Sequence, residues 1–413
     1  MRRAKTLPTP TGFQRAKAAP PLITNIKATS VNLPLDAPYR WVAGLNHGFT
    51  KVVVEVETDA GITGLGEASS WHHAAIISDE LAPKLIGCPA SDLHHCRMMA
   101  VPAIETMQNI EGADVTRAYG AIEIALWDVC ARRAELPLYR LLGGAVRKRI
   151  PFTEYFAARP SNGSAGGYET PEEIGAYCEQ MVAEFGSPFF EGKVGYADLE
   201  TDIEVARNVR HAIGPRRALS LDANMGWRVP TARAALRRLA EFEIANIEDP
   251  VGNLDDMAKL RQHTTIPFST HVPDLRSAAR LGVPDRIVLN LTAVGGIEPT
   301  LRVIAACEAL GIEFSFYSGE TGIGVAAYLH VAAADAHLGT PSQSLVRWYS
   351  CDVIKGGPFV PVEGHLQVPE EPGLGVELDR TALGRAAEAF REHGPLDMTG
   401  LDHSSTYRRP PLY

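Results

Sequence analysis

The sequence predicts an α/β protein in which a barrel of alternating strands and helices follows a smaller α+β domain. From Ile150 onward, eight short apolar segments alternate with amphipathic stretches, and the unit repeats roughly every 25 residues, which suits a closed (β/α) barrel. In residues 23–68, apolar and polar residues alternate instead, which indicates a small antiparallel sheet. The two patterns predict two domains of different architecture.

The chain begins with a segment unlike the rest. Residues 1–22 are basic, rich in proline and free of apolar periodicity, so we expect a flexible leader. Residues 23–148 predict the α+β domain. Within it, ITNIKATSVNLPL and TKVVVEVETDAGITGLGEA form the sheet around an Asp-Ala-Gly turn, and helical segments follow, ending with GAIEIALWDVCARRAELPLYRLLGG.

We expect the barrel in residues 149–365. Its strand candidates are PFTEYFA, PFFEGKV, ALSLDAN, IANIEDP, IPFSTHV, RIVLNL, EFSFYS and SLVRWY. Residues 366–413 contain a Pro-Gly-Leu-Gly turn and one more helix, and we expect them to pack back on the first domain. A doubly wound open sheet is the alternative, but no glycine-rich phosphate loop follows the first strand.

The composition argues against several classes of partner. A net charge of −9 disfavours nucleic acid, because phosphate binding relies on a basic face. No apolar run approaches the roughly 18 to 20 residues that span a bilayer, and no charged start leads into an apolar stretch with a cleavage site. We therefore expect a cytoplasmic protein that binds a small molecule rather than nucleic acid or a membrane.

Polar residues end three consecutive strands of the predicted barrel. Asp222, Glu248 and His271 are one βα unit apart, so they should lie side by side at the carboxyl end, where barrels of this kind carry their function. Two carboxylates and one further ligand suit Mg²⁺, and a histidine ligand makes Mn²⁺ possible. The alternative is that the acids cap the helices that follow their strands.

Lys193 ends the second strand. It follows two phenylalanines and precedes Val-Gly, so its ammonium group should lie in a partly apolar wall near the cation. Desolvation and a neighbouring positive charge both lower the pKa of a lysine towards the range of a general base. The alternative is a structural salt bridge with Glu191 or Asp222.

These motifs together resemble the enolase superfamily, and within it the mandelate racemase and glucarate dehydratase branches. The resemblance covers nearly everything from Ile23 onward and rests on the segments GAIEIALWDVCARRAELPLYRLLGG, LDANMGW, IEDP, VGGI and EEPGLGVELD with Lys193. It implies an α+β capping domain over a modified TIM barrel, (β/α)₇β. It also implies a metal that stabilises an ene-diolate after a base takes the α-proton of a carboxylate substrate, and a homo-oligomer.

By position in the family, Asp222 and Glu248 would be metal ligands, and Asn224 would lie just outside them. His271 falls where the glucarate branch has an asparagine ligand, with Asp274 as the fallback. Lys193 matches the second lysine of the family's Lys-x-Lys motif, which acts as the base.

The chain departs from the family at three positions. The first lysine of the motif is Glu191 here, and the usual Asp-His dyad is replaced by Asn290 and Tyr317. A tyrosine with its usual pKa of about 10 is a poor base at neutral pH, but it can donate a proton to a leaving hydroxide. Chemistry with Lys193 as the one strong base remains.

The resemblance points to further side chains at the site. Glu320 falls near a family glutamate that faces the substrate carboxylate, although it could simply be an acid at a helix N-terminus. Arg347, expected on the last strand, could pair with a distal carboxylate or bridge to the barrel rim. The remaining candidates are Asn46, His47 and Thr50 on one cap loop, Trp71, His72 and His73 on another, and Tyr155 on the first strand.

The sequence therefore favours a Mg²⁺-dependent lyase that dehydrates a hydroxy acid or a glucarate-like acid sugar to a 2-keto acid, with Lys193, Tyr317 and Glu320 as catalytic residues. An epimerase or racemase is the second interpretation, but it needs another base. A catalytically silent relative that binds a small acid is the third.

Overall fold

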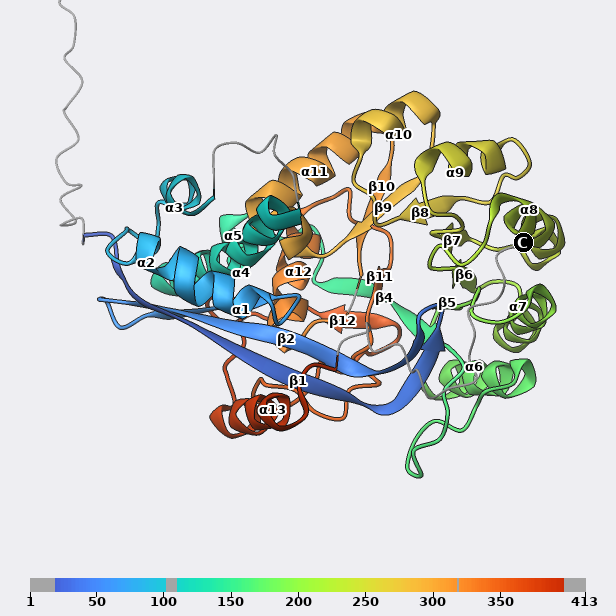
Figure 1. The fold of residues 1–413 in the computed structure, drawn as a ribbon, viewed down its shortest axis with the longest axis horizontal. Coiled ribbons are helices and arrows are strands. Elements are labelled where there is room, and N and C mark those ends of the chain that lie inside the picture. Colours follow the sequence, from blue (N-terminus) through green and yellow to red (C-terminus); the bar gives the residue numbers. More distant parts are fainter. Residues whose placement is uncertain (1–18, 102–109, 318, 397–413) are drawn as a thin grey trace, which may run out of the picture.

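An antiparallel sheet lies beside a nearly closed barrel of parallel strands (Figure 1). This is a computed structural model, and it describes residues 19–101, 110–317 and 319–396. The arrangement confirms the predicted fold class, an α/β barrel with an N-terminal α+β cap. Within the described residues, no helix combines the length and apolar character needed to cross a membrane.

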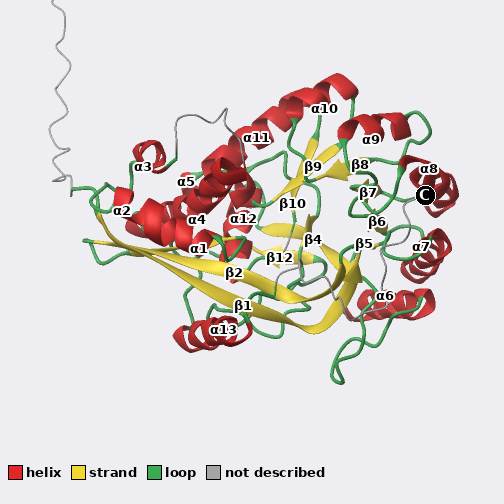
Figure 2. Ribbon diagram, in the orientation of Figure 1, coloured by secondary structure: helices red, strands yellow, loops and turns green. Residues whose placement is uncertain are grey.

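The cap sheet consists of β1 (Ile23–Trp41), β2 (Gly44–Thr58) and β3 (Thr63–Ala68), paired antiparallel in that order. β1 and β2 are long strands that extend from the outer edge of the cap to the barrel (Figure 2). The cap helices are α1 (His73–Ala75), the π-helix η1 (Ile76–Leu81), α2 (Ala82–Leu85), α3 (Leu93–Ala100), α4 (Ile110–Arg133) and α5 (Leu138–Leu141).

Helix α4 packs directly on β3 because β3 carries two glycines. A Cβ atom on Gly64 or Gly66 would lie 2.0 Å from the carbonyl oxygen of Ala125 or Ala121, respectively. No side chain fits at either position. The close approach lets Ile122 of α4 join Val54 of β2 in the buried core of the cap.

The barrel strands follow one another in the sheet except at one seam. They are β4 (Arg149–Phe156), β5 (Phe189–Lys193), β6 (Ala218–Asp222), β7 (Asn246–Glu248), β8 (Phe268–Thr270), β9 (Arg286–Leu289), β10 (Glu313–Phe316) and β11 (Ser342–Gln343). At the seam between β10 and β11, the backbone N–H of Phe316 donates to Ser342 Oγ at 3.3 Å. A short strand, β12 (His365–Gln367), pairs antiparallel with β4.

Each barrel strand except β11 is followed by an α-helix in the described chain, which gives the (β/α)₇β order that the family resemblance implies. The helices are α6 (Pro171–Phe185), α7 (Leu199–Ile213), α8 (Val229–Leu239), α9 (Leu254–Arg261), α10 (Leu275–Leu281), α11 (Ile297–Leu310) and α12 (Gly322–Ala334), with short 3₁₀ turns η2 (Ala240–Phe242) and η3 (Leu291–Val294).

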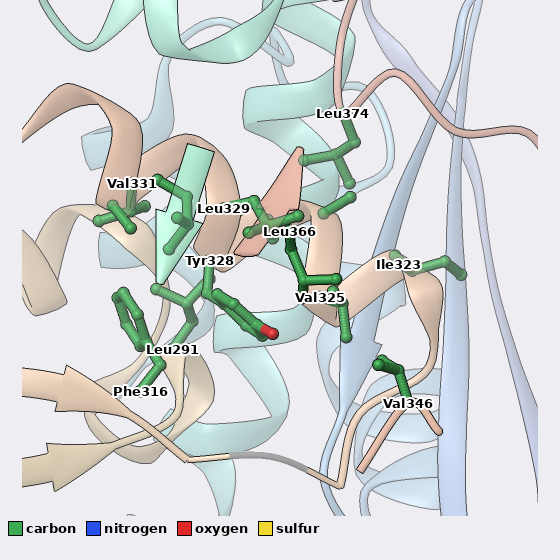
Figure 3. Close-up of a cluster of buried hydrophobic side chains, with 14 of the residues drawn as sticks. Leu291, Phe316, Ile323, Val325, Tyr328, Leu329, Val331, Val346, Leu366 and Leu374 are labelled. Carbon is green, nitrogen blue, oxygen red and sulfur yellow. The ribbon is translucent and has the colours of Figure 1, made fainter. Parts of the chain in front are cut away.

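Helix α12 is buried on all sides. Its residues Ile323, Tyr328 and Val331 lie in one hydrophobic cluster with Phe316 of β10 and Leu366 of β12 (Figure 3). Every residue from Gly322 to Ala333 is buried, which explains why this segment has no polar face in the sequence.

The predicted last strand was wrong in position. SLVRWY, residues 344–349, forms a loop and turn, and the strand is the two residues before it. The apolar residues of that segment are buried by contacts other than strand pairing: Trp348, for example, packs against the rings of Tyr39 and Tyr155. A loop that is buried on several sides has the same run of apolar residues as a core strand, so the sequence pattern did not distinguish the two.

The segment after β12 returns to the cap. Helix α13 (Arg380–His393) lies against β1, and Arg380 Nη2 is 2.6 Å from Glu55 Oε2 of β2. Residues 1–18 of the expected leader lie outside the described residues, and so does the tail from residue 397.

Glu123 of α4 joins the cap to the barrel. Its carboxylate accepts hydrogen bonds from the backbone N–H groups of Ile297 and Glu298, at 2.7 and 2.9 Å, in the first turn of α11. It also accepts one from Trp127 Nε1 at 2.9 Å. Because the N-cap residue of α11 is Gly296, which has no side chain, Glu123 supplies the cap from another domain.

We expect Glu123→Ala to lower the free energy of unfolding by about 2 to 4 kcal/mol, because it leaves buried backbone donors without acceptors. Urea denaturation of Glu123→Ala and of Glu172→Ala measures the effect. Glu172 is an exposed acid in the first turn of α6, and its loss should cost less than about 1 kcal/mol. Equal losses in the two variants would contradict the capping role.

Candidate active site

A cavity of about 610 Å³ lies between the cap and the carboxyl ends of the barrel strands. Among its wall residues are eleven that the sequence singled out as candidates: Thr50, His72, His73, Tyr155, Lys193, Asp222, Asn224, Glu248, His271, Asn290 and Tyr317. The volume is within the usual range for small-molecule sites. The cavity is the candidate active site.

Lys193 and Asp222 end neighbouring strands in register, and their side chains form a buried ion pair. Burial would lower the pKa of Lys193, but the charge of Asp222 outweighs it, and the pKa is raised well above its usual range. The pKa is thus shifted in the direction opposite to the expected one, and the contact is the salt bridge with Asp222 that the sequence left open as an alternative. The sequence argument assumed a positive neighbour, whereas here the nearest charge is a carboxylate.

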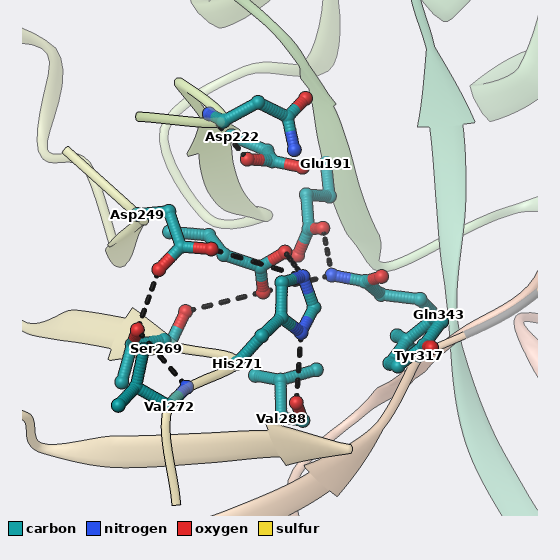
Figure 4. Close-up of polar contacts among 12 residues, drawn as sticks. Glu191, Asp222, Asp249, Ser269, His271, Val272, Val288, Tyr317 and Gln343 are labelled. Atoms are coloured by element: carbon teal, nitrogen blue, oxygen red, sulfur yellow. Dashed lines mark hydrogen bonds and ion pairs between the residues drawn. The ribbon is translucent and has the colours of Figure 1, made fainter. Parts of the chain in front are cut away.

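Glu248 and His271 form a second charged pair beside the first (Figure 4). Glu248 aligns with Asp222 in the strand register, and its Oε1 lies 3.1 Å from His271 Nε2. Burial would raise the pKa of Glu248, but His271, Lys193 and a hydrogen bond from Gln343 lower it to about 2. The same acids raise the pKa of His271 to about 10 against the effect of burial. His271 is thus the counter-ion of Glu248.

His271 is oriented by the next strand. Its Nδ1 donates to the carbonyl oxygen of Val288 at 2.8 Å, which leaves Nε2 facing the carboxylates (Figure 4). A hydrogen bond of this kind fixes which ring nitrogen is available as a ligand. Asp274, the fallback ligand, is exposed, and its Oδ1 accepts the Ser277 N–H at the start of α10, so it does not reach the cavity.

The residues around the two pairs fit a divalent cation. Asp249 adds a third buried carboxyl group, and Asn224 presents a buried Oδ1 atom that has no hydrogen-bond partner in the described part of the chain. Hard oxygen donors of this kind suit Mg²⁺. In the described residues, no three His, Cys, Asp or Glu side chains stand at ligand spacing, since Asp222 faces Lys193 and Glu248 faces His271. The ligand set stays a prediction.

Gln343 lines the cavity and connects Glu191 with Glu248. It was not among the residues predicted from the sequence. Its Nε2 donates to Glu191 and, at 3.0 Å, to Glu248 Oε2 (Figure 4). Burial and the charges of Glu248 and Asp222 raise the pKa of Glu191 well above its usual range. The signal that could have found Gln343 is the end of the last strand, which was expected a few residues later.

Asn290 and Tyr317 meet on the other side of the barrel. Asn290 Nδ2 donates to the Tyr317 hydroxyl oxygen at 2.7 Å, while Asn290 Oδ1 accepts the Ala293 N–H at 2.8 Å. Burial raises the pKa of Tyr317 above its usual value, so the phenol stays neutral. Since its oxygen accepts from Asn290, its own O–H proton can be donated elsewhere.

Glu320 is buried but does not line the main cavity. It borders a separate space of about 20 Å³ behind Asn290 and Tyr317, which line both spaces. Burial raises its pKa, and Lys51 opposes that rise. The structure thus places Glu320 one layer behind the side chains that face the cavity.

The cap contributes fewer of the predicted contacts. The expected loop with Asn46, His47 and Thr50 is part of strand β2. Thr50 lines the cavity, Asn46 is buried behind it and donates to the Tyr39 hydroxyl at 3.0 Å, and His47 is exposed. On the other loop, His72 and His73 line the cavity and Trp71 does not.

Arg347 is not at this cavity. It lies in the turn after β11, its Nε is 2.8 Å from Glu154 Oε1, and it lines a second cavity outside the barrel mouth. Its guanidinium group stacks over the ring of Phe185 at 3.7 Å. The contact is the rim salt bridge that the sequence left open as an alternative.

Comparison with known proteins gives the family. The family model described as mandelate racemase / muconate lactonizing enzyme, N-terminal domain, matches residues 23–143, and the model described as enolase C-terminal domain-like matches residues 173–382. A chloromuconate cycloisomerase of Cupriavidus necator is 30% identical over 378 residues, which are 86% of this chain and 96% of the relative.

Two further proteins are similar over most of their length. A probable glucarate dehydratase of Streptomyces coelicolor is 27% identical, with 87% of this chain and 90% of the relative covered. The crystal structure of an enolase from Thermobispora bispora, complexed with magnesium and formate, superposes with a TM-score of 0.84 at 28% identity, covering 94% of this chain and 99% of that one.

Proposed function

Because the chain belongs to the enolase superfamily, in the mandelate racemase and muconate lactonizing enzyme group, we propose that it is a Mg²⁺-dependent dehydratase of hydroxy acids. Lys193 removes the proton next to a substrate carboxylate, the β-hydroxyl leaves as water, and the product is a 2-keto acid. The observation that carries the proposal is the placement of Lys193 on one side of the cavity and Tyr317 on the other.

Asp222, Glu248 and His271 are the side chains that would hold Mg²⁺. The ion supplies Lewis-acid polarisation of the substrate carboxylate, which makes the adjacent proton more acidic. Ligation of Asp222 would also remove from Lys193 the negative charge that now raises its pKa. The relative crystallised with magnesium and formate supports this choice of ion.

Lys193 is held for proton abstraction by its surroundings. Its Nζ lies 5.5 Å from the centroid of the Tyr155 ring, and the side chain is almost fully buried. The aromatic wall excludes water from the amine, so its proton exchange is directed to the substrate. Burial favours the neutral amine that a base requires.

Tyr317 is the acid in this proposal. Its hydroxyl is oriented by Asn290, and it directly follows β10, which lies three strands from β5 when the barrel is counted across the seam between β10 and β11. A base on one side and an acid on the other suit the loss of a proton and a hydroxide from opposite faces of the substrate. The proton that Lys193 has taken returns through solvent to the phenolate, so both groups regain their starting protonation states.

A product screen tests the proposal. The purified protein is incubated with Mg²⁺ and a library of hydroxy acids and acid sugars, and mass spectrometry follows the loss of one water from each acid. A 2-keto product from at least one acid is the expected result. Interconversion of epimers without loss of water would indicate an epimerase, and no reaction with any acid would indicate a catalytically silent binding protein.

We expect Tyr317→Phe to separate the two half-reactions. Proton abstraction by Lys193 does not need the phenol, so exchange of the α-proton with solvent should persist, while dehydration should fall by about 10²-fold or more, a typical loss for a general acid. NMR in D₂O follows both. As a control, Tyr168→Phe changes a tyrosine that lines the outer cavity instead. Equal loss of exchange and dehydration in Tyr317→Phe would contradict the assigned acid.

A further inference from the structure

One buried cation at the cavity forms no ion pair with any residue that the structure describes. Three lysine or arginine side chains line the cavity in the described part of the chain: Lys51, Arg117 and Lys193. Lys193 is paired with Asp222, and Arg117 Nη1 lies 3.6 Å from Asp114 Oδ1. Lys51 is 5% exposed and makes neither an ion pair nor a hydrogen bond with any residue that the structure describes. It is therefore the free positive charge of the wall.

Two buried acids, Glu67 and Glu320, feel the charge of Lys51 without forming an ion pair with it. Lys51 lowers the pKa of Glu67 and of Glu320, both of which burial raises. The Glu67 carboxylate accepts the backbone N–H of Thr321 at 3.0 Å, whereas both Glu320 carboxylate oxygens are buried without a hydrogen-bond partner among the described residues. Lys51 Nζ instead lies 5.7 Å from the centroid of the Phe49 ring.

A buried ammonium group without a partner is costly, because it gives up its hydration and gains little in return. The β2 strand could bury an apolar residue at this position at no such cost, as it does at Val52, Val53 and Val54. A buried lysine among these valines therefore suggests that a bound ligand supplies the opposite charge. Since Lys51 lines the cavity, the missing partner is an anionic group of the molecule bound there.

The position of Lys51 decides which anionic group. Lys193 affects the carboxyl groups of Glu191, Asp222 and Glu248 on β5, β6 and β7, where the metal ligands are expected. Lys51 affects Glu67 on β3 and Glu320 after β10, on the other side of the barrel. The two cations thus act on different acids around one cavity, Lys193 on those of the barrel strands β5 to β7 and Lys51 on those of β3 and the segment after β10, which suits two separate anionic groups.

We propose that Lys51 binds a second anionic group of the substrate, so that the substrate is a dicarboxylic hydroxy acid. One carboxylate binds at the barrel acids and their cation, and the distal carboxylate binds the Lys51 ammonium group. The proposal rests on the proposed function for the first carboxylate only. Lys51, a cap residue that was not predicted as a site residue, would then select the class of substrate.

Matched acids test the proposal by binding alone. Tartrate and threonate differ only in that threonate has an alcohol in place of one carboxylate, and glucarate and gluconate differ in the same way. Dissociation constants are measured by calorimetry with Mg²⁺ present, in the Lys193→Ala background, where the proposed chemistry cannot proceed. We expect at least one diacid to bind about 10- to 100-fold more tightly than its monoacid, the contribution of a charge-assisted hydrogen bond.

Lys51→Met then removes the charge and keeps the length of the side chain. It should weaken the diacid by about the same 10- to 100-fold and leave the monoacid unchanged, while Lys51→Arg should retain part of the preference. Lys27→Met is the matched control, since Lys27 lies in the neighbouring strand, half exposed, 3.8 Å from Glu55. Thermal unfolding shows whether each variant folds.

The outcomes separate this inference from the proposed function. Equal affinity for diacid and monoacid in the protein that keeps Lys51, or a preference that survives Lys51→Met, overturns the inference even if monoacids are dehydrated. A diacid preference that depends on Lys51, without any proton exchange or dehydration, supports the subsite and overturns the dehydratase. Absence of binding by every acid overturns both.

Discussion

Lys193→Ala should reduce turnover by about 10² to 10⁴-fold, the usual contribution of a general base, and should equally reduce exchange of the substrate α-proton. The physical reason is that Lys193 is the only lysine among the barrel residues that line the cavity, within the described chain. Steady-state kinetics on the acid found by the product screen and NMR in D₂O measure the two losses.

Two comparisons keep this prediction sharp. Lys259→Ala, which removes an exposed lysine paired with Asp256 on α9, should leave both rates unchanged. Lys193→Cys followed by aminoethylation rebuilds an amine of nearly the same length and should restore part of the activity, which a purely structural role would not require. Full activity in Lys193→Ala would remove the base from the mechanism.

Glu248→Gln should weaken Mg²⁺ binding by at least about 10- to 100-fold, because even partners that only support a metal ligand have effects of this size. The variant removes one of the buried charges that attract the cation and leaves a neutral side chain of similar shape. Calorimetric titration with Mg²⁺, and with Mn²⁺ as a second ion, measures the change.

The control for Glu248→Gln is Glu313→Gln. Glu313 begins β10 at the other end of the barrel and lies 2.7 Å from Arg286, so its charge does not face the cavity. Its loss should leave the affinity for Mg²⁺ unaltered. If the two variants bound the ion equally well, Glu248 would not be a ligand, and the acid cluster would be a structural network.

The sequence was informative where geometry follows from chain order. In a parallel barrel the carboxyl ends of all strands meet at one rim, so residues that end successive strands must become neighbours. Lys193, Asp222, Glu248 and His271 converge for that reason alone. The contact between Asn290 and Tyr317, on two further strands, has the same origin.

Features that depend on side-chain direction could not be predicted in this way. His47 and Thr50 both lie on β2, yet one side chain is exposed and the other reaches the cavity. Glu320 lies just after a barrel strand but packs behind the wall. The pKa of Lys193 depends on which charge is nearest, and Asp222 is in direct contact. Each outcome is set by packing across domains rather than by spacing along the chain.

The burial of Lys51 is another feature that could not be predicted from the sequence. In the sequence Lys51 is one polar residue before a run of valines, and nothing in the pattern separates it from a solvated lysine. Only the packing of the cap on the barrel turns it towards a closed cavity and buries it.

The central claim, that Lys193 abstracts the proton next to a substrate carboxylate, has a direct measurement. The protein is incubated with Mg²⁺ and hydroxy acids in D₂O, alongside Lys193→Ala, and NMR follows the α-proton signal of the recovered acid and of any product. The account predicts deuterium at the α-position of substrate or at the corresponding carbon of a 2-keto product, with no deuterium in the variant. Exchange or dehydration that continues at the same rate without Lys193 would contradict it.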